Sequence, residues 1–142
     1  MPKFSLEKTI NAKREKTFEI FSNFENYQKL IPQYYPSIRI RSVRDNTSVV
    51  EEHMNFGDNE LVIMAKHVTK EPVLHEIFVI GGDIKGSYFK QEFVEIPGGT
   101  KIIVDINLKL KGKMKISSLF GQSKFEENYS KILDDLSKIA EI

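Results

Sequence analysis

The chain has 142 residues, of which 40% are hydrophobic and 29% charged, and its formal net charge is +1. This length and balance fit one globular domain, which we expect to span residues 1–142. The absence of cysteine excludes disulfides, thiolate nucleophiles and zinc sites of the cysteine type. A net charge so close to zero gives no extended positive potential that would attract nucleic acid, and we expect no nucleic-acid partner. The first ten residues lack the apolar core of a signal peptide, so we expect a cytoplasmic protein.

The beginning of the chain predicts one strand and two short helices. Apolar and polar residues alternate over residues 3–10, as is typical of a strand. Helical spacing follows over about 13–24, where it places Phe18, Phe21 and Phe24 on one side, and again over about 25–31. Pro32 ends the second helix, because proline disfavours helical geometry in the residue before it.

The rest of the chain predicts an antiparallel sheet and then one long helix. A period of two, interrupted by short turns, predicts five or six strands at about 37–44, 48–56, 60–69, 73–80, 86–96 and 100–111. Short turns favour antiparallel neighbours, so the strands form a meander. The last segment carries one apolar stripe: Leu119, Phe125, Tyr129, Ile132, Leu133, Leu136, Ile139 and Ala140. The predicted fold class is therefore α+β, with the helix packed on a curved antiparallel sheet.

Residues directly opposite each other in an antiparallel pair share a face, so the inner face can be followed from strand to strand. We pair Phe56 with Leu61 and Ile96 with Lys101 around two of the turns. The resulting inner face is mostly apolar, with four polar residues among the apolar ones: Glu52, His67, Glu76 and Gln91.

The place of Glu76 on this face depends on a two-residue turn at Glu71–Pro72. A turn longer by one residue would replace Glu76 with His75.

The polar cluster leaves several interpretations open. An inward histidine or glutamine is most often a hydrogen-bonded core residue, but an unpaired buried carboxylate costs several kcal/mol. The two glutamates therefore indicate a water-filled interior, a Glu–His pair, or an error in the predicted register. If a Glu–His pair acts as general acid or base, the candidate catalytic residues are Glu52, His67 and Glu76. The three histidines do not have the spacing of a ligand motif, so we expect no metal.

Alternate lysines mark the end of the last predicted strand, at Lys109, Lys111, Lys113 and Lys115. Such a row solvates a sheet surface and protects it against aggregation. The alternative is a weak patch for an anionic membrane surface.

Two segments resemble the START-like, or SRPBCC, superfamily. The first is TINAKREKTFEIFSNFENYQKLIP, in which a strand leads through a small polar turn to a helix and then to a proline. The second is GGDIKGSYFKQEFVEIPGGTKIIVDINLKL, which is similar to a hairpin of that group. Within the superfamily the chain looks most like the branch of polyketide cyclases/dehydrases and coenzyme-Q-binding proteins.

The resemblance implies a helix-grip fold, in which a strongly curved seven-stranded antiparallel sheet wraps around the long C-terminal helix and leaves a cavity. It also implies that the two short helices close one end of the grip. The aromatic and aliphatic residues that follow would then be lid residues beside an entrance, or would simply plug the open end: Tyr27, Leu30, Ile31, Tyr34 and Tyr35.

The leading functional hypothesis is binding or transport of a hydrophobic small molecule, such as a lipid, an isoprenoid quinone or an aromatic polyketide-like compound. No cofactor is expected, and the protein is expected to be a monomer or homodimer. The alternative is a cyclase, dehydratase or hydrolase that uses the Glu–His pair, and a protein–protein adaptor is a third class. The residues expected to bind the ligand are Tyr27, Leu30, Tyr35, Glu52, Ile63, His67, Glu76, Phe78, Phe89, Gln91, Phe93, Ile106, Phe125 and Tyr129.

Overall fold

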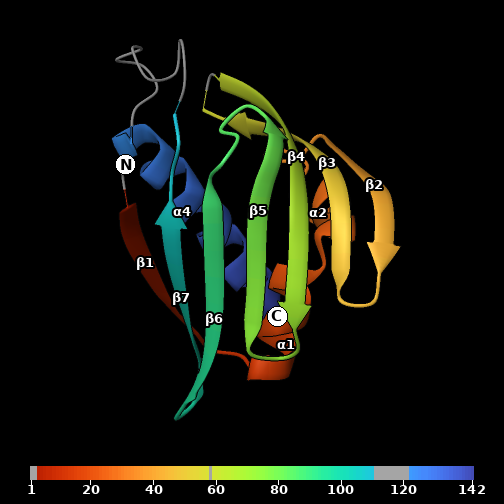
Figure 1. The fold of residues 1–142 in the computed structure, drawn as a ribbon. Helices are drawn as coiled ribbons and strands as arrows, with labels where there is room; N and C mark the ends of the chain where they lie inside the picture. The colour runs from red at the N-terminus through yellow and green to blue at the C-terminus, as the bar shows by residue number, and fades with distance from the viewer. Residues whose placement is uncertain (1–2, 58, 111–121) are drawn as a thin grey trace.

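The computed structural model describes residues 3–57, 59–110 and 122–142, and Figure 1 shows their arrangement. Strands and helices alternate little along the chain, since nearly all helical residues lie near its two ends. The elements are β1 (Lys3–Ile10), α1 (Arg14–Ser22), the 3₁₀ turn η1 (Phe24–Asn26), α2 (Tyr27–Leu30), β2 (Ser37–Arg44), β3 (Thr47–Phe56), β4 (Asn59–Lys70), β5 (Leu74–Gly82), β6 (Tyr88–Ile96), β7 (Gly99–Asn107) and α4 (Gln122–Ala140).

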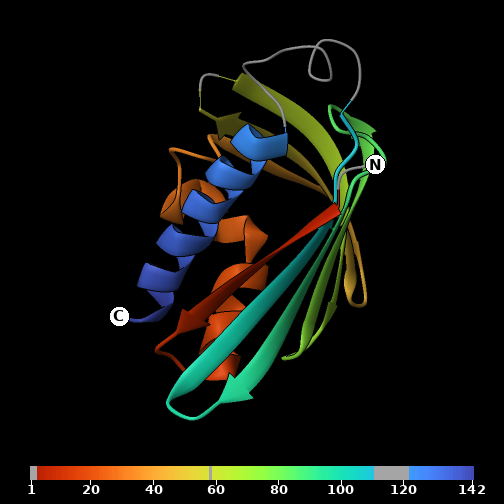
Figure 2. The same ribbon diagram turned by 90° about the vertical axis from the view of Figure 1, so that its left-hand side faces the viewer.

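The seven strands form one antiparallel sheet in the order β1-β7-β6-β5-β4-β3-β2. The sheet is curved, and α4 and the short helices all lie on the same side of it (Figure 2). At the β1 edge, the Lys8 ammonium group fastens α4 by an ion pair to Asp134 and a hydrogen bond to Ser130, both 2.8 Å long. This is the helix-grip architecture that the sequence predicts.

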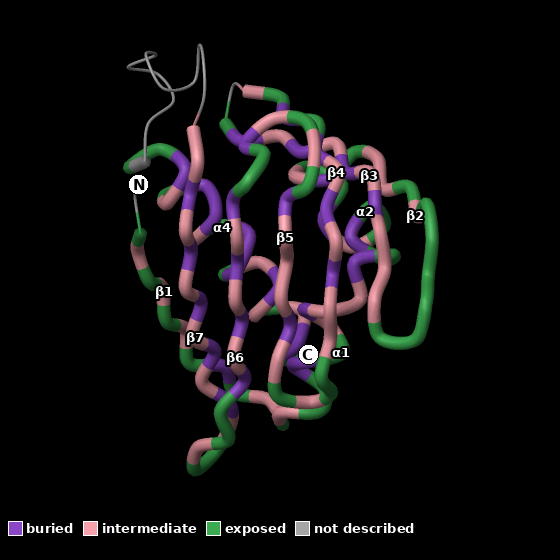
Figure 3. Tube along the Cα trace, in the orientation of Figure 1, coloured by how far each residue is buried: buried purple, intermediate pink, exposed green. Residues whose placement is uncertain are grey.

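Buried residues alternate mostly with partly buried ones along β3, β4, β6 and β7 (Figure 3). The buried ones form one core with apolar side chains of the helices. The observed pairs in two hairpins are Met54 with Leu61 and Phe93 with Ile102. Both registers differ by two residues from the predicted pairing. Because an even shift leaves each side chain on the same face, Glu52 and Gln91 still point inward as predicted.

The predicted register is wrong at β5, where Glu76 and Phe78 lie on the outer face. The connection after Lys70 has three residues, since Lys70 pairs with Leu74. This odd shift turns every side chain of β5 over. Glu76 accepts a hydrogen bond from the Tyr88 hydroxyl, and the Lys66 ammonium group lies 5.0 Å from the centre of the Phe78 ring. His75 takes the inward place and is fully buried.

The helices cover the inner face with aromatic side chains. Phe18 and Phe21 of α1 pack edge-on against Phe93 of β6, with ring centres 5.0 and 5.9 Å away. Phe24 of η1 is also buried, which confirms the predicted side of this segment.

The segment after α2 closes one end of the grip. Tyr27 and Tyr35 are buried with ring centres 4.9 Å apart, and Ile31 is buried near them. The Tyr34 hydroxyl donates a 2.7 Å hydrogen bond to Asp135 of α4. These contacts are those of a plug; a lid function for the same residues remains a prediction.

The apolar stripe of α4 is buried as predicted over Phe125–Ala140. Lys111, Lys113, Lys115 and Leu119 lie outside the described residues. Within the described parts of the chain, no helix combines the length and apolar character needed to cross a membrane.

Candidate functional site

Five buried polar side chains form a continuous chain of hydrogen bonds across the inner face of the sheet. We call this chain the polar band. The His67 imidazole lies between Glu52, whose Oε2 is 2.6 Å from His67 Nε2, and His75, whose Nε2 is 2.8 Å from His67 Nδ1. His75 Nδ1 lies 2.7 Å from Gln91 Oε1, and Gln91 Nε2 donates to the Tyr129 hydroxyl oxygen over 3.0 Å. None of the five is more than 4% exposed.

Each member of the polar band comes from a different element. Glu52, His67, His75 and Gln91 occupy inward positions of β3, β4, β5 and β6, which are four adjacent strands, and Tyr129 reaches the band from α4. The strand pairing brings the four strand residues into one row. The band therefore follows directly from in-and-out alternation across neighbouring strands.

The hydrogen-bond partners fix where the protons of the band lie. Gln91 Oε1 can only accept, so His75 Nδ1 must carry a hydrogen. Burial, and next the charge of His67, lower the pKa of His75 to about 3, so this ring is neutral and its Nε2 accepts from His67 Nδ1–H. One further proton then lies between His67 Nε2 and Glu52 Oε2.

That shared proton gives the Glu52–His67 pair two hydrogen-bonded forms, an ion pair and a neutral acid with a neutral imidazole. Both forms keep the short contact. The pair therefore holds a proton that can change position without breaking a hydrogen bond, and it can act as a general acid or base only where it also reaches a substrate.

Three tyrosines lie within electrostatic reach of Glu52. Burial raises the pKa of Tyr27 and Tyr35 well above the usual value, and the charge of Glu52 contributes to both shifts. Burial, with a contribution from Glu52, also raises the pKa of Tyr129. All three are therefore neutral hydroxyl groups at physiological pH. The Tyr27 hydroxyl donates to the backbone oxygen of Phe21.

A groove of about 310 Å³ reaches the polar band from the surface, between the α1–η1 segment and the ends of β3 and β4. His67 lies at its inner end, and the Phe24 ring packs over the His67 ring with centres 4.2 Å apart. The remaining lining is mostly polar: Glu19, Ser22, Asn23, Glu25, Asp45, Asn46, Ser48, Thr69 and Glu71, together with Phe18.

Aromatic side chains fill much of the described interior on the other side of the band. Phe125 of α4 lies 4.7 Å from Phe56 and 5.9 Å from Phe89 between ring centres, and Phe89 lies 5.2 Å from Tyr129. These side chains are buried.

The structure brings four predicted site residues together in the band: Glu52, His67, Gln91 and Tyr129. Ile63, Phe89, Phe93, Ile106 and Phe125 are buried around it, with Tyr27 and Tyr35 at one end. Leu30 is only partly buried. Glu76 and Phe78 face away from the site, and the prediction that they belong to it is wrong.

Two residues of the site were missing from the predicted set. His75 was named only as the result of a longer turn, and the three-residue connection is the signal that would have included it. Phe24 was predicted to face inward, but nothing in the spacing predicts that it covers His67.

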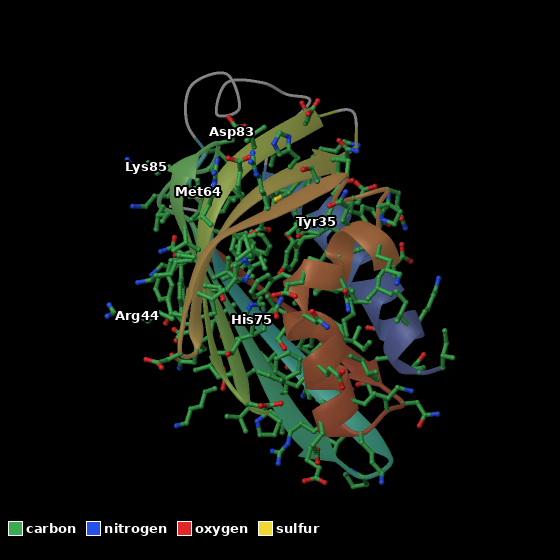
Figure 4. The ribbon with its side chains drawn as sticks, turned by 90° about the vertical axis from the view of Figure 1, so that its right-hand side faces the viewer. Tyr35, Arg44, Met64, His75, Asp83 and Lys85 are labelled. Atoms are coloured by element: carbon green, nitrogen blue, oxygen red, sulfur yellow. The ribbon has the colours of Figure 1, made fainter. Side chains whose placement is uncertain are left out.

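Figure 4 shows Tyr35 and His75 in the space between the sheet and the helices, whereas Arg44 and Lys85 lie on the outer side. Among residues 3–57, 59–110 and 122–142, no group of three or more acidic or histidine side chains is arranged to hold a metal ion. Glu52, His67 and His75 instead use their polar atoms on one another and on Gln91.

Solved structures resemble the whole chain, although their sequences differ widely from it. TTHA0849 from Thermus thermophilus superposes with a TM-score of 0.85 at 13% identity, over 98% of this chain and 97% of that one. The ginseng major latex-like protein 151 from Panax ginseng gives 0.79 at 12% identity, over 98% and 97%. The Zhui aromatase/cyclase from Streptomyces sp. R1128 gives 0.75 at 13% identity, over 99% and 93%. No protein-family model and no curated protein matches the sequence.

Proposed function

We propose that this chain, whose fold is the helix-grip fold of the START-like superfamily, binds a hydrophobic small molecule between its sheet and α4. The classes of ligand that fit are a lipid, an isoprenoid quinone or an aromatic polyketide-like compound. One structural neighbour is an aromatase/cyclase, and this likeness favours a ring compound among these classes.

The observation that carries the proposal is the polar band enclosed by aromatic side chains. Along β6 the inward residues are Phe89, Gln91 and Phe93, so apolar surface lies on both sides of the band. Small-molecule sites typically combine apolar walls with a few convergent polar groups that orient the ligand. A core that served stability alone would gain more from apolar residues at these positions, because buried polar groups contribute little net free energy.

The groove that ends at His67 is the proposed entrance. Phe24 packs over His67 at the inner end of the groove, and at 8% it is the most exposed of the buried hydrophobic residues. A ligand that entered here would displace the Phe24 ring from His67 and then contact the apolar walls. Binding should therefore be accompanied by movement of aromatic side chains.

Two measurements test this proposal. Solvent extraction of the purified protein followed by mass spectrometry should recover a hydrophobic compound in near-stoichiometric amount. Titration with Nile red, an uncharged apolar dye, should give a saturable increase in fluorescence. Addition of the recovered compound should displace the dye and reverse this increase. If no compound is recovered and the dye does not bind to folded protein, the proposed function is wrong.

A matched pair of variants on β4 locates the site. Ala65 is fully buried on the inner face between Ile63 and His67, whereas Val62 is 39% exposed on the outer face. We expect Ala65→Leu to weaken Nile red binding and Val62→Leu to leave it unchanged. Equal effects would mean that the dye binds outside the grip.

A second function, acid–base catalysis, is supported by the 2.6 Å contact between His67 and Glu52. In this case the protein would change the compound that it binds, and the shared proton would be transferred during the reaction. Incubation of a recovered compound with the protein should then give a product of different mass. Glu52→Gln should abolish this conversion while it preserves dye binding; conversion at the wild-type rate would contradict a role for the pair.

A further inference from the structure

Glu52 of the polar band and the nearby Tyr35 have hydrogen-bonding capacity that no described residue uses. Within the described chain the Tyr35 hydroxyl makes no hydrogen bond, although this residue is only 5% exposed. In the Glu52 carboxyl group, Oε2 contacts His67, and Oε1 has no partner among the same residues. Such groups are uncommon in protein interiors, where nearly all buried polar atoms are paired.

The free atoms also border open space. Among the described residues, the fully enclosed side-chain nitrogen and oxygen atoms that lack a partner are Arg14 Nε and Asn107 Oδ1. The Tyr35 hydroxyl and Glu52 Oε1 are not of this kind. Each is therefore within reach of a water-sized group, although the residues around them are buried.

Tyr129 adds a third hydrogen-bonding group. Its hydroxyl oxygen accepts from Gln91 Nε2, and within the described chain its own O–H has no acceptor. The hydroxyl thus retains one donor, held in a fixed place by α4 and β6.

The backbone brings Tyr35 close to Glu52. Ile38 pairs with Glu52, and the Tyr34 backbone oxygen accepts from Asn55 N over 2.8 Å, so residues 34–38 lie along the β3 segment that carries Glu52. After burial, the charge of Glu52 is the largest cause that raises the pKa of Tyr35. The same charge also raises the pKa of Tyr129. Tyr35 and Tyr129 therefore both lie within electrostatic reach of Glu52.

We propose that Tyr35, Glu52 and Tyr129 form a subsite for an uncharged hydroxyl group of the ligand, an inference that rests on the proposed function. The ligand O–H donates to Glu52 Oε1, and the ligand oxygen accepts from the Tyr35 or Tyr129 hydroxyl. An alcohol or phenol satisfies both kinds of protein group at once, since a hydroxyl both donates and accepts.

The same chemistry disfavours ethers and carboxylates. An ether cannot donate, so Glu52 Oε1 would stay unpaired when the ligand excludes water from it. A carboxylate would need a cation, yet the described buried side chains include no lysine or arginine. Burying an anion without a partner is strongly unfavourable.

The test compares three probes of one ring system: 2-naphthol, 2-methoxynaphthalene and 2-naphthoate. We expect 2-naphthol to bind about tenfold or more tightly than the ether by calorimetry, as expected when a hydrogen bond to a buried carboxyl group is lost. The carboxylate should bind more weakly than the ether. Tyr35→Phe should reduce the preference for naphthol over the ether by at least a factor of a few.

Tyr34→Phe is the matched control, because it removes a neighbouring hydroxyl that donates to Asp135 instead of facing Glu52. It should leave the naphthol preference unchanged. Glu52→Gln should reduce the preference and also improve binding of 2-naphthoate. If this variant fails to fold, the Tyr35→Phe and Tyr34→Phe pair decides the question.

The outcomes separate this inference from the proposed function. If naphthol and its ether bind equally, or Tyr35→Phe and Tyr34→Phe act alike, the hydroxyl subsite is wrong although the protein binds apolar ligands. If Nile red binds and no naphthalene probe does, the subsite is also wrong. If neither Nile red nor any probe binds, both proposals fail.

Discussion

The inner face of the sheet contains two kinds of region that are equally buried but differ in what their burial contributes. The aromatic regions, around Phe93 on one side and Phe89 on the other, remove apolar surface from water and stabilise the fold directly. The polar band between them exchanges hydrogen bonds to water for hydrogen bonds within the protein, which yields little net stability.

The difference separates scaffold from site. In the aromatic regions, a change that loses volume should cost stability in proportion to the cavity left behind. In the polar band, the cost should depend on whether a change leaves a buried partner unpaired. The losses of stability caused by substitutions should therefore differ between the two regions in magnitude. They should also differ in whether they add in double variants and in whether they depend on pH.

The largest effect is expected in the aromatic region at Phe93, which packs against Phe18 and Phe21. Phe93→Ala should lower the free energy of unfolding by about 4 kcal/mol, because it removes a buried ring and leaves a cavity. Urea unfolding measures this loss. Val94→Ala is the control on the same strand, since Val94 is 40% exposed on the outer face, and it should cost less than 1 kcal/mol, about the range of surface substitutions. Similar losses for both would mean that β6 does not have the described orientation.

The second-largest loss of stability is expected within the polar band. Glu52→Leu leaves His67 Nε2 without its partner and should cost about 3 kcal/mol. His67→Leu should have a comparable cost. The double variant should lose clearly less than the sum of the two, because it removes both members of the pair, and the interaction energy should be about 1 kcal/mol or more.

A double-mutant cycle by urea unfolding measures this interaction. Additive losses would show that Glu52 and His67 are not coupled, and the distinction between polar band and aromatic regions would fail there.

The sequence predicted the fold and most of the band, and it was wrong where hydrophobic alternation carries no information. In β3 and β6 the turn errors amount to two residues, and this even shift left Glu52 and Gln91 on the correct face. In β5 the apolar run Ile77–Ile80 occupies both faces. Only the turn length could then decide the orientation, and the predicted turn is one residue too short.

The hydrogen bonds of the band lay beyond sequence reasoning. That Glu52 and His67 share a face follows from alternation, but their 2.6 Å contact depends on how far the strands are shifted and on the side-chain torsions. The link from Gln91 to Tyr129 depends further on how α4 is placed across the sheet. These contacts join residues 15 and 38 positions apart in the chain, and no local pattern specifies them.

His75 should make the stability of the protein depend on pH. Its pKa in the folded state is lowered to about 3, chiefly by burial and next by His67, whereas an unfolded histidine titrates near 6.5. Between these values the unfolded state binds a proton that the folded state does not. Stability from this group is therefore complete above pH 6.5 and is lost as the pH falls towards 3, by at most about 1.4 kcal/mol per pH unit.

Thermal and urea unfolding between pH 7 and pH 4 test this dependence with two variants. His75→Gln should be less stable than the wild type at pH 7, and the difference should shrink as the pH falls. His53→Gln is the control on the outer face, where His53 is partly exposed near Glu51 and Glu60. Because this variant retains His75, it should still lose stability as the pH falls. A constant difference for His75→Gln would exclude His75 as the source of the acid sensitivity.

The smallest effect is expected where the plug segment meets α4, outside both regions. Tyr34→Phe removes the 2.7 Å hydrogen bond to Asp135 and should lower the free energy of unfolding by about 1 kcal/mol. Asp135→Asn keeps an acceptor oxygen for the Tyr34 hydroxyl and should cost less. Because Tyr34 is only partly buried and contacts neither the polar band nor the aromatic regions by hydrogen bonding, its loss should add to that of Phe93→Ala within about 0.5 kcal/mol. Strong non-additivity would show that the plug and the aromatic core form one cooperative unit, and that the plug residues are scaffold rather than a separately moving lid.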